Sequence, residues 1–165
     1  MHHSAFLLIP LLLAAPVASA AEPVKVAVAE IDFQDNTGAP EQKPKAHVER
    51  AKKFGEALRK DLGDSGQYKI VPLDCGKDPC SVAHQAPEDL IAAAKNAGAR
   101  ILVYGGVRKL SPVMQNLQAQ AVDIEAAKLV FDRAISLRGD DAKSWERAER
   151  DLAEALLKSP LQASQ

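Results

Sequence analysis

Four polar residues, Asp32, Gln34, Asp35 and Asn36, lie close together just after the first apolar segment of the mature sequence. In open α/β sheets, ligands bind where parallel strands end and the neighbouring crossovers diverge. If residues 24–33 form such a strand, Asp32, Asp35 and Asn36 are candidate contacts for a polar ligand. The sequence favours a simpler interpretation, a solvated loop in which Asp35 and Asn36 form a turn.

A second polar group lies near the end of the chain, where Arg138-Gly139-Asp140-Asp141 precedes Trp145. An indole beside a charged turn could shape a pocket, so Arg138, Asp141 and Trp145 are candidate binding residues. In the structural alternative, Gly139 turns the chain, Asp140 or Asp141 caps a helix, Arg138 pairs with a carboxylate and Trp145 packs in the core.

Two cysteines, Cys75 and Cys80, enclose a short segment that contains Gly76 and Pro79. In an oxidising compartment two nearby cysteines form a disulfide, and Gly and Pro suit the turn that it needs. A redox pair is more typically spaced Cys-x-x-Cys. A zinc site would need two more ligands, and only His84 is close in sequence. We expect a structural disulfide and no metal.

Familiar catalytic motifs are absent from the sequence, which has no glycine-rich phosphate loop, no HExxH and no GxSxG. The pair Gly105-Gly106 lies inside a strand pattern and indicates close packing. His47 and His84 remain after export, and each is better explained as a surface residue than as a general base. We therefore expect no enzymatic activity and no cofactor.

The first 20 residues predict a secretory signal peptide. Residues 6–17 form an apolar stretch that is too short for a bilayer, which needs about 20 apolar residues. The Ala-Ser-Ala sequence at 18–20 suits signal peptidase, although the start carries His2 and His3 in place of Lys or Arg. We expect cleavage near Ala20 and a periplasmic or secreted protein; the alternative is an uncleaved anchor or a buried N-terminal helix.

The charge balance argues against a polyanionic partner, because 21 basic residues face 22 acidic ones and the net charge is −1. We therefore expect no nucleic acid binding. No second apolar run approaches membrane length, so no transmembrane segment is expected. The remaining length suits one α/β domain at residues 21–158, followed by a frayed tail at 159–165. The oligomeric state cannot be derived from these features.

Hydrophobic periodicity predicts five strands and three helices. The expected strands are 24–33, 68–73, 100–107, 113–123 and 128–137; the expected helices are 46–62, 87–97 and one that follows Asp140 or Asp141. In the first helix, the buried stripe is expected to comprise Val48, Ala51, Phe54, Leu58 and Leu62.

The element order β-α-β-α-β-β-β-α predicts an α/β fold with a mixed sheet in two or three layers. Right-handed crossovers place the first three strands parallel, in the order 2-1-3. The last two strands form an antiparallel hairpin that extends the sheet, which gives the order 2-1-3-4-5.

The segments 96–100, 102–107 and 109–111 resemble a family of small secreted proteobacterial proteins of unknown function, of the DUF2380/DUF3280 kind. That family also shows an Arg-Gly-Asp-x-Asp-x-Ser-Trp-like segment near its end, which corresponds to residues 138–145, and paired cysteines before the second helix. One departure lies in the hairpin, where the family tends to have a Thr-Gly turn and this chain has Ala126-Ala127.

The resemblance implies an envelope protein similar in architecture to the amino-terminal domain of the translocation protein TolB and to domains of outer-membrane assembly lipoproteins. Such domains mostly bind other proteins, and the family brings no catalytic residues. We therefore expect a periplasmic non-enzymatic accessory or interaction domain whose partner is another envelope protein. The alternative is a periplasmic small-ligand binding protein that uses the loop after the first strand, and whether residues 34–45 become ordered on binding stays open.

Overall fold

A computed structural model describes residues 22–38, 40 and 44–161 of the protein. The strands are β1 (Val24–Val28), β2 (Asp32–Asp35), β3 (Tyr68–Ile70), β4 (Ile101–Ser111), β5 (Met114–Asp123) and β6 (Lys128–Arg138). The helices are α1 (Pro44–Asp64), α2 (Pro87–Asn96) and α3 (Ala142–Lys158). The predicted signal peptide, residues 1–20, lies outside the described residues.

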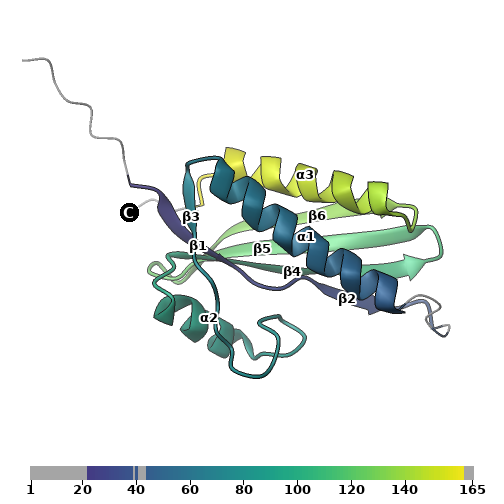
Figure 1. Ribbon diagram of the computed structural model, residues 1–165, viewed down its shortest axis with the longest axis horizontal. Coiled ribbons are helices and arrows are strands. Elements are labelled where there is room, and N and C mark those ends of the chain that lie inside the picture. The colour runs from purple at the N-terminus through teal and green to yellow at the C-terminus, as the bar shows by residue number, and fades with distance from the viewer. Residues whose placement is uncertain (1–21, 39, 41–43, 162–165) are drawn as a thin grey trace, which may run out of the picture.

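One mixed sheet carries the fold, with the strand order β3-β1-β4-β5-β6 and with β2 paired to β4 (Figure 1). β1 runs parallel to β3 and β4, whereas β5 and β6 are antiparallel. The predicted α/β class is confirmed, and so is the sequence of neighbours among the predicted strands. The order differs in one detail: the predicted first strand is divided into β1 and β2, so the sheet has six strands.

The division between β1 and β2 is a bulge opposite β4. Val28 pairs with Val103, and Asp32 pairs with Gly106, so the first strand has one residue more than β4 between these pairs. The extra length turns the N–H of Glu30 away from β4, and it donates to the carbonyl oxygen of Cys80 at 2.8 Å. The bulge thus attaches the cysteine-containing loop to the sheet.

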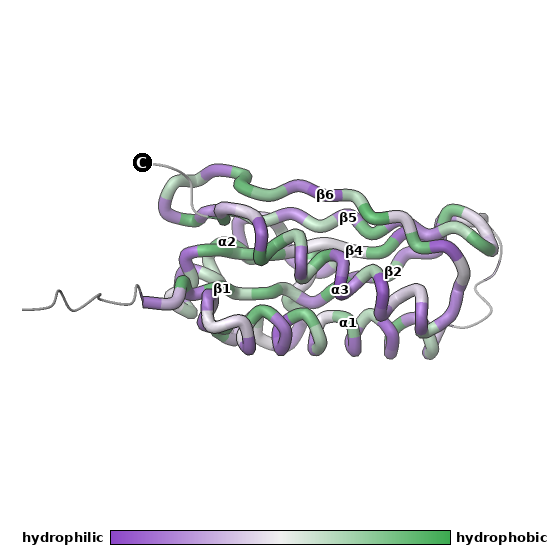
Figure 2. Tube along the Cα trace, turned by 90° about the horizontal axis from the view of Figure 1, so that it is seen from above, coloured by the Kyte–Doolittle hydropathy of each residue, from purple (hydrophilic) through white to green (hydrophobic). Residues whose placement is uncertain are grey.

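Helices α1 and α3 cover one face of the sheet, and α2 covers part of the other face (Figure 1). The larger core lies between the sheet and α1 and α3, and a smaller apolar cluster lies under α2. Along β5, Leu117, Ala119 and Ala121 are fully buried against the helices, and the residues between them are partly exposed. The hydropathy alternation expected of a half-solvated strand is visible along β5 (Figure 2).

The buried stripe of α1 begins one residue earlier than predicted. Val48 was expected in the core, but it is 66% exposed, and His47 is 0% exposed in its place. His47 and Ala51 are four residues apart, so they lie on one helix face just as residues three apart would. The expectation that His47 is a surface residue is therefore wrong.

The predicted disulfide joins Cys75 and Cys80, with 5.4 Å between their Cα atoms. In the β5–β6 turn, Ala127 has a φ of 51°, a left-handed conformation that costs an alanine more than a glycine. This is where the resemblance expects Thr-Gly, so the chain keeps the turn without its glycine.

The packed domain extends past residue 158, since Leu161 is 3% exposed and belongs to the larger core. The rest of the predicted tail, 162–165, lies outside the described residues. Among the described residues, no helix combines the length and apolar character needed to cross a bilayer.

Candidate functional site

Asp140, in the connection between β6 and α3, is the centre of a polar cluster. Its carboxylate accepts hydrogen bonds from Arg50 at 2.5 Å, and from Lys109 and Gln115 at 3.3 Å. His47 Nε2 lies 2.8 Å from Oδ1 of the same carboxylate. The side chain of Asp140 is only 16% exposed, so α1, β4, β5 and the β6–α3 turn are joined through one half-buried charge.

A second carboxylate extends this cluster to the loop after β2. Oδ2 of Asp35 lies 3.8 Å from Lys109 Nζ, and Oδ2 of Asp140 lies 3.3 Å from the same nitrogen. Lys109 therefore bridges the two carboxylates. Asp35 also accepts hydrogen bonds from the backbone N–H and the hydroxyl of Thr37, at 2.9 and 2.7 Å. The structure thus brings one residue from the first predicted site beside the segment that contains the second.

The charges in the cluster stabilise the ionised carboxylates. Hydrogen bonds from Thr37 hold the pKa of Asp35 below its ordinary value. Burial by itself would raise the pKa of Asp140, but the hydrogen bonds and charges of His47 and Lys109 outweigh it and lower the pKa to about 2. Both groups are therefore anionic at any physiological pH.

Aromatic rings close the cluster from the side of the core. The Phe33 ring stacks on His47 with 4.1 Å between the ring centroids. The ring centroid of Trp145 lies 6.1 Å from that of Phe33 and 6.3 Å from that of Phe54. Trp145 is 3% exposed. Because His47 is packed under an aromatic ring, this cluster is suited to fixing the loop and the turns in place rather than to meeting a substrate.

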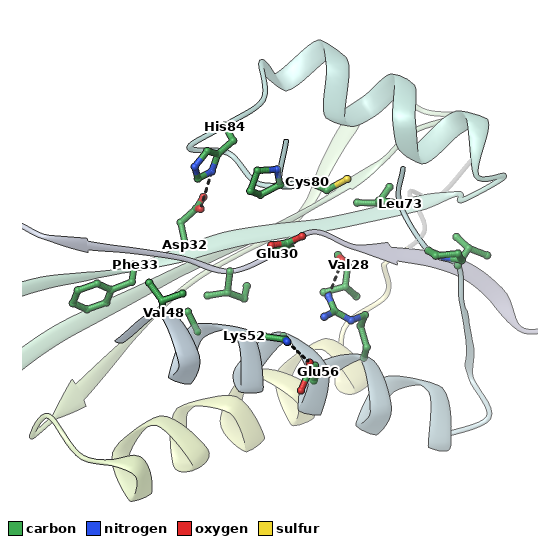
Figure 3. Close-up of a pocket in the computed structure, with 17 residues that line it drawn as sticks. Val28, Glu30, Asp32, Phe33, Val48, Lys52, Glu56, Leu73, Cys80 and His84 are labelled. Carbon is green, nitrogen blue, oxygen red and sulfur yellow. Dashed lines mark hydrogen bonds and ion pairs between the residues drawn. The ribbon is translucent and has the colours of Figure 1, made fainter. Parts of the chain in front are cut away.

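A cavity of about 530 Å³ lies between α1 and the segment 71–84 that carries the disulfide. Ile31, Val48 and Leu73 contribute apolar walls. Asp32 and His84 lie toward the disulfide side of the cavity, and Lys52 and Glu56 lie on α1 (Figure 3). The cavity therefore has apolar walls and mixed charges.

Ser81, His84 and Asp32 form a group with the residue types of a catalytic triad but not its geometry. Ser81 Oγ lies 2.9 Å from His84 Nδ1, and Asp32 Oδ1 lies 3.8 Å from the same nitrogen. A proton relay needs the serine and the carboxylate on opposite ring nitrogens. Ser81 is also only 1% exposed. The group instead fastens the disulfide loop, since Asp32 Oδ2 accepts from Ala83 N at 2.9 Å.

The structure separates the residues of the first predicted site. Asp32 lines the cavity, whereas Asp35 belongs to the Asp140 cluster. The backbone N–H of Asn36 donates to Lys109 O at 2.9 Å, which prolongs the β2–β4 ladder by one residue.

The residues of the second predicted site have structural contacts or lie on the surface. Asp141 caps α3, because its Oδ1 accepts from Ser144 N at 2.9 Å, and that hydrogen bond lowers its pKa. Trp145 packs in the core. Arg138 is exposed and forms no ion pair within the described residues, so the carboxylate partner expected for it is absent there.

Four residues of the cluster were not predicted from the sequence: His47, Arg50, Lys109 and Gln115. Asp140 was considered only as a possible helix cap, whereas in the structure its carboxylate accepts the hydrogen bonds of the cluster. His47 is the member with a usable signal, because it shares a helix face with Ala51 and a buried histidine needs a partner. Across the described segments, no three His, Cys, Asp or Glu side chains converge as a metal site would require.

This combination of a mixed sheet, two helices on one face and one on the other defines a class of small α/β domains with several solved members. The PelC dodecamer from Paraburkholderia phytofirmans is 18% identical, with a TM-score of 0.54 over 88% of this chain and 92% of that chain. Lipoprotein GNA1162 from Neisseria meningitidis is 14% identical, with a TM-score of 0.52 over 84% of this chain and 99% of that chain.

TolB from Acinetobacter baumannii is 13% identical, with a TM-score of 0.50 over 84% of this chain and 28% of that chain, which confirms the predicted likeness to TolB in architecture. Among curated proteins, none matches this sequence. The chain belongs to the family described as "Protein of unknown function (DUF2380)", whose DUF3280 model matches residues 24–157.

Proposed function

We propose that this protein is a non-enzymatic interaction domain of the bacterial cell envelope, and that it binds another protein through the tip of its β4–β5 hairpin. The tip, residues 110–114, carries the proposal because it presents apolar side chains to solvent. Leu110 is 49% exposed, Val113 is 69% exposed and Met114 is 53% exposed. Contiguous exposed apolar surface marks interaction sites in soluble proteins.

The tip is held firmly from below by the Asp140 cluster. Gln115, 1% exposed, follows the tip and donates to the carbonyl oxygen of Gly139 and to Asp140, both at 3.3 Å. Gly139 N donates in turn to Val113 O at 3.0 Å. The Asp140 cluster therefore holds the base of the exposed apolar turn in place. A turn with a fixed shape loses less entropy when it binds a partner.

An envelope location is supported by three observations. The first 20 residues have the pattern of a signal peptide, and the Cys75–Cys80 disulfide suits an oxidising compartment. One similar structure is that of a lipoprotein, and another is that of a dodecamer, so this fold occurs in proteins that assemble.

The triad-like group around His84 lacks relay geometry, which supports a binding role rather than catalysis.

The test is site-specific photo-crosslinking in the native cell envelope. A photoreactive amino acid at Val113 is expected to give a discrete protein adduct. The matched control is Leu129 on β6, which is 52% exposed and pairs with Val122 of β5. Val122 pairs in turn with Leu102 near the start of β4, so Leu129 lies at the opposite end of the sheet from the tip. Equal adducts at both positions, or none at Val113, would contradict a binding role for the tip.

A small-ligand binding protein is the second candidate, and the cavity beside α1 favours it. Its volume of about 530 Å³ lies in the range of ligand pockets, about 300–1,000 Å³. A ligand that binds only the folded state raises the thermal midpoint. We expect Asp32→Ala to abolish any such gain from a metabolite panel and Asp35→Ala, outside the cavity, to keep it; a gain unaffected by Asp32→Ala would exclude this site.

A further inference from the structure

The cavity beside α1 opens to solvent, and the side chains along one side of its opening are apolar. Val48, on the first turns of α1, is 66% exposed and lines the cavity together with Ile31 and Phe33 from the bulge and β2 (Figure 3). An exposed valine at a cavity mouth leaves apolar surface in water until something covers it. The occupant that fits this wall has an apolar end.

The hairpin tip has the shape of such an end. Ser111 pairs with Met114, so only Pro112 and Val113 lie between the two strands at the turn. The β4–β5 ladder continues up to this pair, so the tip prolongs the sheet and cannot fold back into the cavity of its own chain. A narrow turn with exposed Val113 and Met114 is small enough to enter a cavity of about 530 Å³.

The tip is flanked by positive charge. Arg108 on β4 and Arg138 on β6, opposite Met114, are exposed. Within the described part of the chain neither of them forms an ion pair. The tip therefore presents apolar side chains between two cations that are free to meet carboxylates.

The cavity offers carboxylates in excess. Glu30, Asp32 and Glu56 line it, against the cations Lys52 and Arg59. Lys52 already lies 3.9 Å from Glu56, and Arg59 donates to the backbone oxygen of Val28 at 3.2 Å. Asp32 already accepts from Ala83 N and lies 3.8 Å from His84 Nδ1. The carboxylate of Glu30, which is exposed and forms no ion pair within the described residues, is therefore the charge left to attract an incoming cationic group.

We infer that the hairpin tip of one copy of this chain docks into the cavity beside α1 of a second copy, in a head-to-tail contact. The inference rests on the proposed function, because it identifies the protein that the tip binds. Each docked pair still has one free tip and one free cavity, so the contact propagates until it closes in a ring or continues as a chain. A turn in a cavity is a small interface, below about 1,200 Å², so association should rise with concentration.

The experiment is sedimentation velocity of the purified mature protein over a range of concentrations. The wild type is expected to sediment faster as concentration rises. Val113→Asp places a charge on the tip, and Val48→Lys places one at the cavity mouth; each should weaken association by about tenfold or more. Both positions are exposed, so unchanged urea midpoints should show that both variants fold.

Mixing the two variants tests the head-to-tail arrangement directly. The Val48→Lys copy has an intact tip and the Val113→Asp copy has an intact cavity, so the mixture should regain association that neither variant shows alone. A mixture no better than its components, or a Val113→Asp variant that associates like the wild type, would overturn the inference.

Crosslinking at Val113 separates this inference from the proposed function. An adduct between two copies of this chain supports both. An adduct with a different envelope protein keeps the proposed function and overturns self-docking, and the absence of any adduct overturns both.

Discussion

Replacing Asp140 by asparagine should show how much stability the polar cluster contributes. Asp140→Asn keeps the size of the side chain but removes the charge that Arg50 and Lys109 approach. Two cations would then face a neutral amide in a half-buried place, and removing one partner of such a pair costs more than the pair itself contributes. We expect a clear loss of stability at neutral pH.

The magnitude follows from the pKa of Asp140, which is lowered from 3.8 to about 2. At about 1.36 kcal/mol per pKa unit, the shift corresponds to about 2.4 kcal/mol. Solvent reaches 16% of the side chain, so screening reduces the charge contribution to about 1–2 kcal/mol. With the lost hydrogen bonds, Asp140→Asn should lower the free energy of unfolding by about 2 kcal/mol, or the urea midpoint by about 1 M.

The pH dependence has a definite sign. A carboxyl whose pKa is lowered by folding stabilises the protein above its unfolded pKa, 3.8, and that stability is lost as the pH falls through about 2. The difference in the free energy of unfolding between wild type and Asp140→Asn should therefore be constant near neutral pH. It should become smaller below about pH 4 and nearly vanish near pH 2.

The assay is urea unfolding followed by the fluorescence of Trp145, the single tryptophan, which is 3% exposed in the fold. Asp151→Asn is the matched control, since Asp151 is exposed on α3 and forms no ion pair within the described residues. Equal midpoints for wild type and Asp140→Asn at neutral pH, or a difference that persists unchanged near pH 2, would refute the reasoning.

Three other variants have defined outcomes. Burial raises the pKa of Glu149 to about 7, so the protonated side chain, which the fold favours, is lost as the pH rises through about 7. In urea unfolding, Glu149→Gln should therefore leave the free energy of unfolding unchanged at about pH 5. At about pH 8 the same variant should raise it by about 1–2 kcal/mol. Replacing Cys75 and Cys80 together by serine should cost about 2 kcal/mol, measured by thermal unfolding. Ala127→Gly should stabilise by about 0.5 kcal/mol, because glycine adopts a positive φ without strain.

Each of these substitutions has its own control. Glu146→Gln, exposed on the same helix as Glu149, should show no such change between the two pH values. Alkylation of the unfolded, unreduced protein at Cys75 or Cys80 would contradict the disulfide. Ala126→Gly should destabilise the turn, since Ala126 has no positive φ; equal effects at Ala126 and Ala127 would contradict the strain argument.

Hydrophobic periodicity was sufficient for most of the fold, because strands buried on one or both faces repeat their apolar residues in a recognisable way. It could not predict the bulge after Val28, since Ala29 and Ile31 continue the apolar pattern and both are buried. The bulge depends on a contact with Cys80, which is distant in sequence. Local patterns contain no information about such a contact.

The error in α1 has a different cause. Positions three and four residues before Ala51 satisfy the helical period equally well, and hydrophobicity favoured Val48 over His47. The outcome was decided by Asp140, which offers a carboxylate to a buried imidazole from the other end of the chain. For the same reason the candidate site was predicted only in part: the polar segments around Asp35 and Asp140 were recognised, but their link through Lys109 is a tertiary contact.

The pairing of β1 with β4 has a consequence for how the chain folds. Val26 lies opposite Ile101, so these strands meet only after a long intervening segment has been closed, whereas β4, β5, β6 and α3 follow one another directly. Local contacts form faster than distant ones, so the C-terminal half should act as the folding nucleus and the N-terminal half should join last. During synthesis, however, β1 emerges first, and only the short strand β3 is available to pair with it until β4 has been made. A chain that cannot complete its sheet before its second half is present stays extended longer, which suits the export that its first 20 residues predict.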